Sequence, residues 1–417
     1  MTPAARLQAA IDILTALETT DQPTDRLLRE FFRARRYAGS KDRAAIGQRV
    51  FEIQRQRAAL AWRIGSDTPR ALALASVLAD GEEPQALFTG GGYGPAVLSD
   101  EEKAAMAAAR GAPPLYVQGA FPAFLESELV RAFGDDLLAQ MQALNRRAPV
   151  DLRVNTLRRE RGEVLDALIA QGFAAAATPY APHGIRIASG EGSAALRTGA
   201  MFESGAYEFQ DEAAQIAALL CDARPGQRVL DLAAGAGGKS LALAAAMRNE
   251  GEIVACDIRQ PALQELAVRA KRAGAANIRT FLIDPALPEG PFDTVLVDAP
   301  CSGTGTWRRQ PELRWKLTPD ILAARMAVQD TLLADAAGLV KPGGRLVYAT
   351  CSILPCENED RVAAFLARDG RFKTVRADSA WRDDGEKALP PPGMAESFTA
   401  SPLKTGTDGF FVAVLER

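Results

Sequence analysis

The sequence predicts an α/β protein whose C-terminal half forms a mostly parallel, doubly wound sheet. Three observations support this fold class. From about Glu208 onward, strand-like and helix-like patterns alternate, as in a parallel sheet with helical crossovers. The first ~140 residues instead repeat apolar side chains at helical spacing. Between these parts, Val150–Thr156 alternates apolar and polar residues as a half-buried strand does.

The bulk properties set the broad class of the protein. At 417 residues, with an ordinary balance of apolar and charged side chains, the chain fits two or three globular domains. We expect a helical domain over residues 1–140, a small α+β subdomain over residues 141–205 and a sheet domain over residues 206–417. A net charge of −3 argues against a generally basic, nucleic-acid-coating protein, although it leaves room for a local basic patch.

The sequence also bears on location and on metals. It contains no run of about 18 apolar residues, so we expect no membrane span. The five cysteines are scattered and no pair has zinc-finger spacing, which fits a reducing cytoplasm. The single histidine, His183, lies in a turn-like segment and argues against Ser-His-Asp chemistry and histidine metal sites. We therefore expect a cytoplasmic protein without a metal site, and a monomer by default.

Apolar spacing predicts helices through the N-terminal domain. Leu7–Leu17 and Ile46–Ile64 both repeat apolar residues on one helix face. Ser99 and Glu102 form a capping-box signature in front of an alanine-rich helix. Another helix pattern follows Pro122, so the whole segment is expected to be helical.

Strand patterns dominate the remaining parts. Val150–Thr156, a helix pattern beginning at Val164 and short β-like pieces up to about Ile187 predict the small α+β unit. In the sheet domain, helix patterns are expected between the first five strands, and ligands should bind at the carboxyl ends of the strands. The strand candidates are Arg228–Leu232, Glu252–Cys256, Ile278–Ile283, Thr294–Asp298, Gly344–Thr350 and Gly409–Leu415.

The loop Asp231–Ser240, DLAAGAGGKS, follows the first of these strands and opens a helix. Its last three residues, Gly238-Lys239-Ser240, match the end of the phosphate-binding motif GxxxxGKS/T, but Ala233 replaces the first glycine of that motif. Asp231 precedes the glycines, where it would repel a triphosphate and suit the ammonium group of an aminoacyl tail. We therefore favour an S-adenosylmethionine loop, with a P-loop NTPase as an alternative.

Two more acids stand at the ends of the following strands. Asp257, roughly twenty residues further on, can accept both ribose hydroxyls, as acids do in dinucleotide-binding folds. Asp284, after the third strand, could meet the adenine amino group. Solvation and helix capping are the plainer explanation for each acid taken singly. NAD-type binding also stays open, although the loop lacks a full GxGxxG motif.

Cys301 and Cys351 are predicted to lie just past the ends of the fourth and fifth strands. Cys301 follows Asp298-Ala299-Pro300, and Cys351 follows Tyr348-Ala349-Thr350. One cysteine in such a place would be interpreted as buried and structural. Two at matching positions favour a functional pair, because a disulfide does not suit the cytoplasm and a zinc pair lacks further ligands. Cys356 is expected to be structural.

A thiol together with a methyl donor suits methylation at carbon 5 of cytosine. Carbon 5 is a poor nucleophile, but attack of a thiolate on carbon 6 turns it into an enamine carbon that can take a methyl group. The adduct must then lose the carbon-5 proton and expel the thiol, which a second thiol could assist. Asp298 could hydrogen-bond the N3/N4 edge of the cytosine. Methylation of base amino groups needs no nucleophile, so the cysteines discriminate within the methyltransferase class.

These segments together resemble the Fmu/Sun (RsmB-like) RNA 5-cytosine methyltransferases. The resemblance is carried by Val229–Ser240, Asp298–Gly305, Tyr348–Ser352 and Gly406–Phe411, and it extends upstream to Leu152–Leu157. The helical start resembles the NusB-like domain of the ribosomal-RNA branch. The resemblance implies a Rossmann-like class I methyltransferase domain with a mostly parallel seven-stranded sheet, S-adenosylmethionine as cofactor and structured RNA as partner.

The resemblance also implies roles for individual residues. Cys351 is the expected nucleophile, and Cys301 is expected to assist product release. Asp298 and Lys239 complete the catalytic set, and Lys239 is expected to pair with an active-site acid. The residues expected to line the cofactor are Ala233, Ala234, Gly235, Ala236, Gly237, Gly238, Lys239, Asp257, Asp284 and Asp298. The family usually has Ala and Pro where this chain has Gly235 and Ala236, and both changes loosen the loop.

Two basic segments are candidate RNA contacts. Asn145–Arg161, with Arg153 in its middle, is rich in arginine, and Trp307–Lys316 adds two tryptophans close to Cys301. Phosphate binding by Arg and stacking by Trp fit RNA, although a charged helix face explains the first segment equally well. The sequence thus predicts an S-adenosylmethionine-dependent RNA cytosine-5 methyltransferase acting on ribosomal RNA. Transfer RNA as the substrate and a non-catalytic RNA-binding assembly factor are the alternatives.

Overall fold

The computed structural model describes residues 1–188, 193–381 and 390–417 and separates into two compact units. Unit 1 contains Met1–Asn145 together with Arg309–Leu317, and unit 2 contains Arg146–Arg308 together with Thr318–Arg417. The three-part division expected from the sequence is a finer one and stays a prediction.

Unit 1 consists of helices, and those between residues 3 and 107 pack around one apolar cluster. The first helix begins at a proline, after Thr2 has capped it by accepting a hydrogen bond from the Ala5 N–H. The capping box of Ser99 and Glu102 is confirmed, since each side chain accepts from the backbone N–H of the other. The helices are α1 (Pro3–Glu18), α2 (Thr24–Ala34), α3 (Ser40–Ile64), α4 (Pro69–Ala79), α5 (Pro84–Leu87), α6 (Asp100–Ala107), α7 (Leu115–Gln118), α8 (Glu126–Phe133), α9 (Leu137–Asn145) and α16 (Glu312–Lys316), with 3-10 turns η1 (Ala123–Leu125) and η2 (Gly134–Asp136).

Helix α16 belongs to unit 1 although its sequence lies inside the sheet domain. The buried Glu312 carboxylate accepts a hydrogen bond from the Thr24 backbone N–H at 2.9 Å. The indole N–H of Trp315 donates to the backbone carbonyl of Gln54 at 2.6 Å. These contacts place residues 309–317 among the helices of unit 1, joined to α2 and α3 by directed hydrogen bonds.

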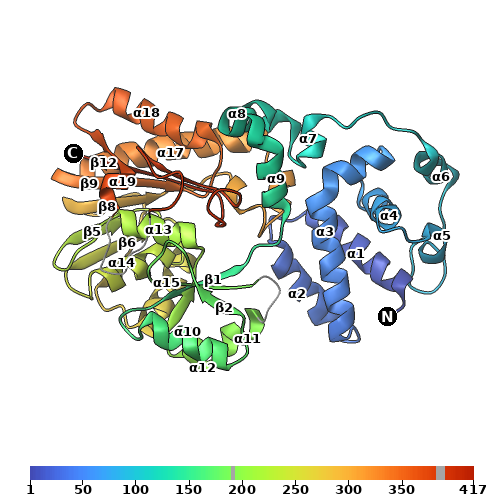
Figure 1. Cartoon of the computed structure of the whole chain (residues 1–417), viewed down its shortest axis with the longest axis horizontal. Helices are drawn as coiled ribbons and strands as arrows, with labels where there is room; N and C mark the ends of the chain where they lie inside the picture. The colour runs from blue at the N-terminus through green and yellow to red at the C-terminus, as the bar shows by residue number, and fades with distance from the viewer. Residues whose placement is uncertain (189–192, 382–389) are drawn as a thin grey trace. The chain divides into compact units, whose positions relative to one another are not determined.

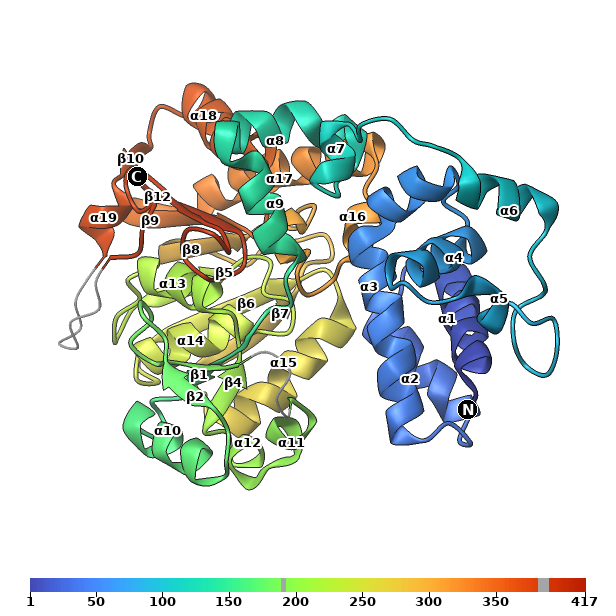
Figure 2. The same ribbon diagram turned by 45° about the vertical axis from the view of Figure 1, so that its right-hand side comes forward.

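Unit 2 begins with a small antiparallel sheet in the order β2-β3-β1-β4, with short helices beside it (Figure 2). Its Arg186 pairs with Asp151 at 2.7 Å and with Glu212 at 3.3 Å, which ties the sheet to α13 (Glu212–Leu220). The buried hydroxyl of Tyr207 donates to the Leu196 carbonyl at 2.7 Å. The elements are β1 (Val150–Val154), α10 (Arg161–Ala170), β2 (Ala175–Ala177), β3 (Gly184–Ile187), α11 (Ser193–Thr198), α12 (Ala200–Glu203) and β4 (Tyr207–Phe209).

The rest of unit 2 is built on a large sheet. Its strand order is β10-β12-β9-β8-β5-β6-β7, and β11 pairs with β12. Strands β5 to β9 pair in parallel, whereas β12 is antiparallel to β9, β10 and β11. The predicted mostly parallel doubly wound sheet is therefore confirmed. The strands are β5 (Arg228–Asp231), β6 (Glu252–Asp257), β7 (Ile278–Leu282), β8 (Phe292–Asp298), β9 (Val340–Thr350), β10 (Lys373–Val375), β11 (Phe398–Ala400) and β12 (Phe410–Glu416).

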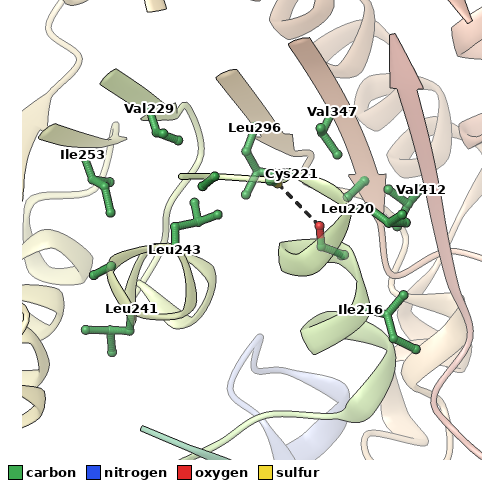
Figure 3. Close-up of a cluster of buried hydrophobic side chains, with 14 of the residues drawn as sticks. Ile216, Leu220, Cys221, Val229, Leu241, Leu243, Ile253, Leu296, Val347 and Val412 are labelled. Atoms are coloured by element: carbon green, nitrogen blue, oxygen red, sulfur yellow. Dashed lines mark hydrogen bonds between the residues drawn. The ribbon is translucent and has the colours of Figure 1, made fainter. Parts of the chain in front are cut away.

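Helices cover both faces of this sheet (Figure 1). Because successive side chains of a strand point to opposite faces, Val229 joins the cluster under α13, α14 (Gly238–Ala246) and α15 (Gln260–Ala273). Leu230 joins the opposite cluster under α17 (Pro319–Leu339) and α18 (Glu359–Arg368). Figure 3 shows the first cluster, in which the Cys221 thiol donates to the Ala217 carbonyl at 3.4 Å. Short elements complete the unit: η3 (Thr304–Thr306), η4 (Pro355–Glu357) and α19 (Ala377–Ala380).

The connection between β7 and β8 corrects one prediction. A helix was expected there, but residues 283–291, all of which the structure describes, contain none. Pro285, Pro288 and Pro291 each fix φ and remove a backbone N–H, so this short connection stays irregular. Over the described ranges, no helix combines the length and the apolar character that a bilayer crossing requires.

Replacing Glu312 with Ala should loosen unit 1 around α2. The change leaves the buried Thr24 N–H without its acceptor, which typically costs about 1–3 kcal/mol. We expect faster hydrogen exchange at the Thr24 amide and a lower unfolding midpoint in urea. The exposed Asp21→Ala variant serves as the control, and unchanged exchange at Thr24 would contradict the assigned contact.

Candidate active site

The carboxyl ends of β5, β8 and β9 bring the predicted reactive residues to one edge of the sheet. Parallel pairing aligns Asp231 with Leu296 and Asp298 with Ala349, so these strands end at the same level. The residues that follow β8 and β9 carry the two cysteines. Their Sγ atoms lie 3.4 Å apart, both side chains are partly exposed, and neither forms a disulfide.

Lys239 extends from the first turn of α14 toward the end of β8. Its Nζ lies 2.6 Å from Asp298 Oδ2 and 5.0 Å from the ring centre of Phe410. The predicted pairing with an acid is therefore seen. Burial alone would lower the pKa of Lys239, but the charge of Asp298 and its hydrogen bond raise it above the usual value. Lys239 is thus an ammonium group, and its charge also interacts with Cys351.

Backbone contacts hold the two cysteine loops against each other. The Gly305 N–H donates to the Cys351 carbonyl at 2.9 Å, and the Ile353 N–H donates to the Thr304 hydroxyl oxygen at 3.0 Å. A Cβ on Gly305 would lie 2.0 Å from the carbonyl oxygen of Gly409, so this close approach requires glycine. The thiol separation is therefore set by main-chain packing.

The contact between the two thiols affects the pKa of Cys301. The hydrogen bond to Cys351, burial and the charge of Cys351 together raise the pKa of Cys301 well above its usual value. Cys301 is consequently favoured in its neutral thiol form.

The glycine-rich loop is fixed from inside by strand β6. The Ala234 N–H donates to the Cys256 carbonyl at 2.7 Å, and the Gly235 N–H donates to Asp257 Oδ2 at 2.9 Å. Gly237 has φ +79°, and a Cβ there would lie 2.4 Å from Leu266 Cγ. A side chain at this position would therefore displace the loop.

Two arginines fix the same loop from outside. Arg153 of β1 donates to the Gly238 carbonyl at 2.6 Å, and Arg269 of α15 donates to the Ala236 carbonyl at 2.7 Å. Arg153 is buried, and burial lowers its pKa to about 10. Its predicted role as an RNA contact is wrong, because its side chain is used inside unit 2. The contribution of Arg269 was not predicted, since nothing in its helical surroundings distinguishes it from a surface arginine.

The three strand-end acids differ in their surroundings. Asp231 is fully buried, and its Oδ2 accepts from the Ser240 hydroxyl at 2.6 Å, whereas Oδ1 has no partner among the described residues. Burial raises the pKa of Asp231 to about 7. Asp257 accepts from the backbone N–H and Nε of Arg259 at 2.8 and 3.0 Å. Asp284 is exposed on the loop after β7.

This arrangement fits a ligand with an aminoacyl tail and a ribose. The unpartnered Asp231 Oδ1 is an acceptor suited to an ammonium group, and the glycine loop allows close backbone approach. Asp257 stands at the end of β6, and the neighbouring Ile258, 74 % exposed, offers an apolar surface. Among the described residues, no group of three or more His, Cys, Asp or Glu side chains is arranged to hold a metal ion.

The segment Trp307–Lys316 does not offer the RNA contacts predicted from its sequence. Trp307 and Arg314 are fully buried, and Arg314 donates to Asn145 Oδ1 at 2.6 Å. Arg308 is buried as well and pairs with Asp211 at 3.2 Å. Trp315, as described above, and Lys316, which donates to the Thr20 carbonyl at 2.7 Å, are used inside unit 1. The basic and aromatic side chains of this segment therefore anchor it to the rest of the folded chain.

Exposed positive charge lies elsewhere. In the segment 145–161, Arg146, Arg147, Arg158 and Arg159 are exposed. A second basic surface, residues 33–43 at the turn between α2 and α3, was not singled out from the sequence. Its exposed charged side chains are Arg33, Arg36, Lys41 and Arg43.

Comparison with known proteins finds two matching family models and many relatives. The model described as 16S rRNA methyltransferase RsmB/F matches residues 218–416, and the RsmF/B-like ferredoxin-like domain model matches residues 121–192. Ribosomal RNA small subunit methyltransferase B of Pseudomonas syringae pv. tomato is 35% identical over 305 residues, covering 72% of this chain and 66% of that protein. A Synechocystis sp. protein named "Probable ribosomal RNA small subunit methyltransferase B" is 33% identical, covering 72% and 67%. The matches thus span about two thirds of these relatives.

Solved structures show the same fold. The crystal structure of PH0851 covers 100% of this chain and 99% of that chain, with a TM-score of 0.78 and 26% identity. A methyltransferase homolog protein from Pyrococcus horikoshii covers 72% and 97%, with a TM-score of 0.60 and 27% identity. NSun6 from Pyrococcus horikoshii, solved with SFG, has a TM-score of 0.61 at 22% identity over 72% of this chain and 98% of that one, a likeness of fold alone.

Asp231 should give the stability a measurable pH dependence. Its pKa rises from 3.8 to about 7 on folding, so between these values the folded protein binds a proton that the unfolded chain has lost. The contribution of Asp231 to the free energy of unfolding therefore falls as the pH rises through this interval. Asp231→Asn removes the titration.

The Asp231→Asn variant should thus gain stability relative to the parent protein as the pH rises from about 4 to about 7, and gain no more above that range. Urea unfolding at a series of pH values measures this difference. The exposed Asp166→Asn variant is the control. A difference that does not vary with pH would contradict the raised pKa.

Proposed function

Because the chain belongs to the RsmB/F family of 16S rRNA methyltransferases, we propose that it transfers a methyl group from S-adenosylmethionine to carbon 5 of a cytosine in ribosomal RNA. The observation that carries the proposal is the pair of thiols 3.4 Å apart at the edge that also holds Lys239 and Asp298. Methylation of a base amino group would leave both thiols without a use. The names of the relatives favour ribosomal over transfer RNA.

We assign the cofactor to the loop after β5. Bound there, S-adenosylmethionine would supply an electrophilic methyl group. Asp231 Oδ1 would accept from its ammonium group, and Asp257 would accept from the ribose hydroxyls in exchange for its contacts with Arg259. Asp284 is assigned to the adenine amino group. The residues assigned to line the cofactor are Ala233, Ala234, Gly235, Ala236, Gly237, Gly238, Lys239, Asp257, Asp284 and Asp298.

Cys351 is assigned as the nucleophile. The positive charge of Lys239 interacts with Cys351. Attack by the thiolate forms a bond from Sγ to carbon 6 of the cytosine, and the ring electrons move toward carbon 5, which then takes the methyl group. Asp298 is assigned to the N3/N4 edge of the base, where its carboxylate would accept from the amino group.

Cys301 is assigned to product release. After methylation, carbon 5 loses its proton to water, the double bond to carbon 6 re-forms, and the bond to Cys351 breaks. The neutral thiol of Cys301, 3.4 Å away, can donate a hydrogen bond to the departing thiolate. This assistance needs a protonated Cys301, which its raised pKa provides.

We also propose that residues 33–43 contact the RNA backbone. This stretch holds five Lys or Arg residues and one acid, Asp42. Asp42 already pairs with Arg6 at 2.9 Å, so it offsets little of that charge. Arginine and lysine on such a surface bind phosphates and release counterions.

We propose a monomer that works in the cytoplasm, where its ribosomal RNA substrate would be found.

The two cysteine variants test the proposed chemistry. Cys351→Ala should give neither a covalent RNA complex nor methylated product, because carbon 6 is then not attacked. Cys301→Ala should form a complex with substrate RNA and S-adenosylmethionine that survives denaturing gels, because release is slowed. Gel analysis and nucleoside mass spectrometry report both outcomes. Methylation by the Cys351→Ala protein would contradict the assigned roles.

The basic surface can be tested by charge removal. We expect the Arg33→Gln, Arg36→Gln, Lys41→Gln protein to bind substrate RNA about ten-fold or more weakly at low salt, with a salt slope lower by roughly 2 to 3. The turnover at saturating RNA should stay unchanged. Fluorescence anisotropy over a salt series measures the binding.

A matched variant removes the same number of charges from the other exposed basic segment: Arg147→Gln, Arg158→Gln and Arg159→Gln. It separates the two surfaces, because the total charge is the same in both proteins. If only this second variant binds RNA more weakly, the contact at residues 33–43 is wrong.

A further inference from the structure

Behind the two cysteine loops lies a fully buried carboxylate, Glu357 of η4, which the mechanism above does not use. It accepts from the Ser302 backbone N–H at 2.8 Å, from the Ser302 hydroxyl, and from Gln329 Nε2 at 3.0 Å. All three groups donate to it, which is the pattern expected around an ionised carboxylate. Glu357 thus holds the residue that directly follows Cys301.

Within the described ranges, the side-chain carboxylate of Glu357 is bound by Ser302 and Gln329. Among the described residues, none of its partners is a lysine or an arginine. A buried charge without a counter-ion acts strongly on its neighbours, because little solvent screens it. Cys301 directly precedes Ser302, whose backbone N–H and hydroxyl both donate to Glu357.

The two thiols interact with different charged side chains. Lys239 interacts with Cys351, whereas the negative charge of Glu357 interacts with Cys301. The titratable and charged groups from the elements packed around the pair are Lys239 from α14, Asp231 from β5, Asp298 from β8, Tyr348 from β9, Glu357 from η4, and the Arg361–Asp330 pair from α18 and α17.

We propose that Glu357 is a positioning residue that fixes the Cys301 loop and keeps Cys301 in its protonated form. The assignment of Cys351 as nucleophile rests on the proposed function, whereas the protonation of Cys301 does not. The hydrogen bond to Cys351 and burial raise the pKa of Cys301, and the charge of Glu357 acts in the same direction.

The thiols can be titrated one at a time in the full chain without RNA. In a Cys351→Ala background, we compare the pH dependence of iodoacetamide alkylation at Cys301 with and without Glu357→Gln, using peptide mass spectrometry. Removing the charge should move the Cys301 curve to lower pH by roughly one pH unit, the effect of losing one nearby like charge from a poorly solvated site. A curve that does not move would overturn the proposal.

Two matched controls sharpen this result. In a Cys301→Ala background, Glu357→Gln should leave the Cys351 curve in place, and an equal shift there would overturn the selective effect on Cys301. Glu359→Gln removes an exposed acid two positions away and should leave the Cys301 curve unchanged. An equal shift with Glu359→Gln would also count against the proposal.

A second variant keeps the test open if Glu357→Gln does not fold. Ser302→Ala removes one donor but keeps the carboxylate, whose charge is then less compensated, so the Cys301 curve should move to higher pH. A shift to lower pH would contradict the proposed role. Because these titrations need neither RNA nor cofactor, their failure is distinguishable from a failure of the methylation chemistry.

Discussion

The parallel register of β5, β8 and β9 is the constraint on which the site depends. Asp298 lies opposite Ala349, and Asp231 lies opposite Leu296, so the loops after these strands begin at one level. Both sheet faces are packed against helices, so a slip of one residue would move each strand side chain to the opposite face and disrupt its packing there. The hydrophobic packing of the sheet therefore fixes the register, and the register brings the two cysteines together.

Nearby charged side chains then give Cys301 and Cys351 different surroundings. Lys239 forms an ion pair with the partly exposed Asp298, and Glu357 supplies a negative charge behind Cys301, so two chemically identical thiols have different environments. Backbone hydrogen bonds restrain the cofactor loop. Gly235 and Ala236 depart from the usual family residues toward a looser backbone, but the N–H of the former binds Asp257 and the carbonyl of the latter binds Arg269. These bonds restrain a loop whose sequence alone suggests mobility.

The sequence predicted what depends on local pattern. Strand periodicity located the strand ends, and therefore the positions of Cys301, Cys351 and Asp298, because the carboxyl ends of parallel strands share one edge. It missed what depends on contacts between distant segments. Arg314 looked like a phosphate ligand because its neighbours are basic and aromatic, yet it is buried beside Asn145. Glu357 was not singled out from the sequence, because only the folded chain places it beside Ser302.

Trapping with substrate RNA that carries 5-fluorocytosine tests the central claim most directly. The fluorine replaces the carbon-5 hydrogen that must leave as a proton after methyl transfer. The reaction should therefore stop at the covalent protein–RNA adduct. We predict one methylated fluorocytosine attached to the peptide that contains Cys351, identified by protease digestion and mass spectrometry. Attachment to Cys301, or methyl transfer without any protein–RNA bond, would contradict the assignment of Cys351 as the nucleophile.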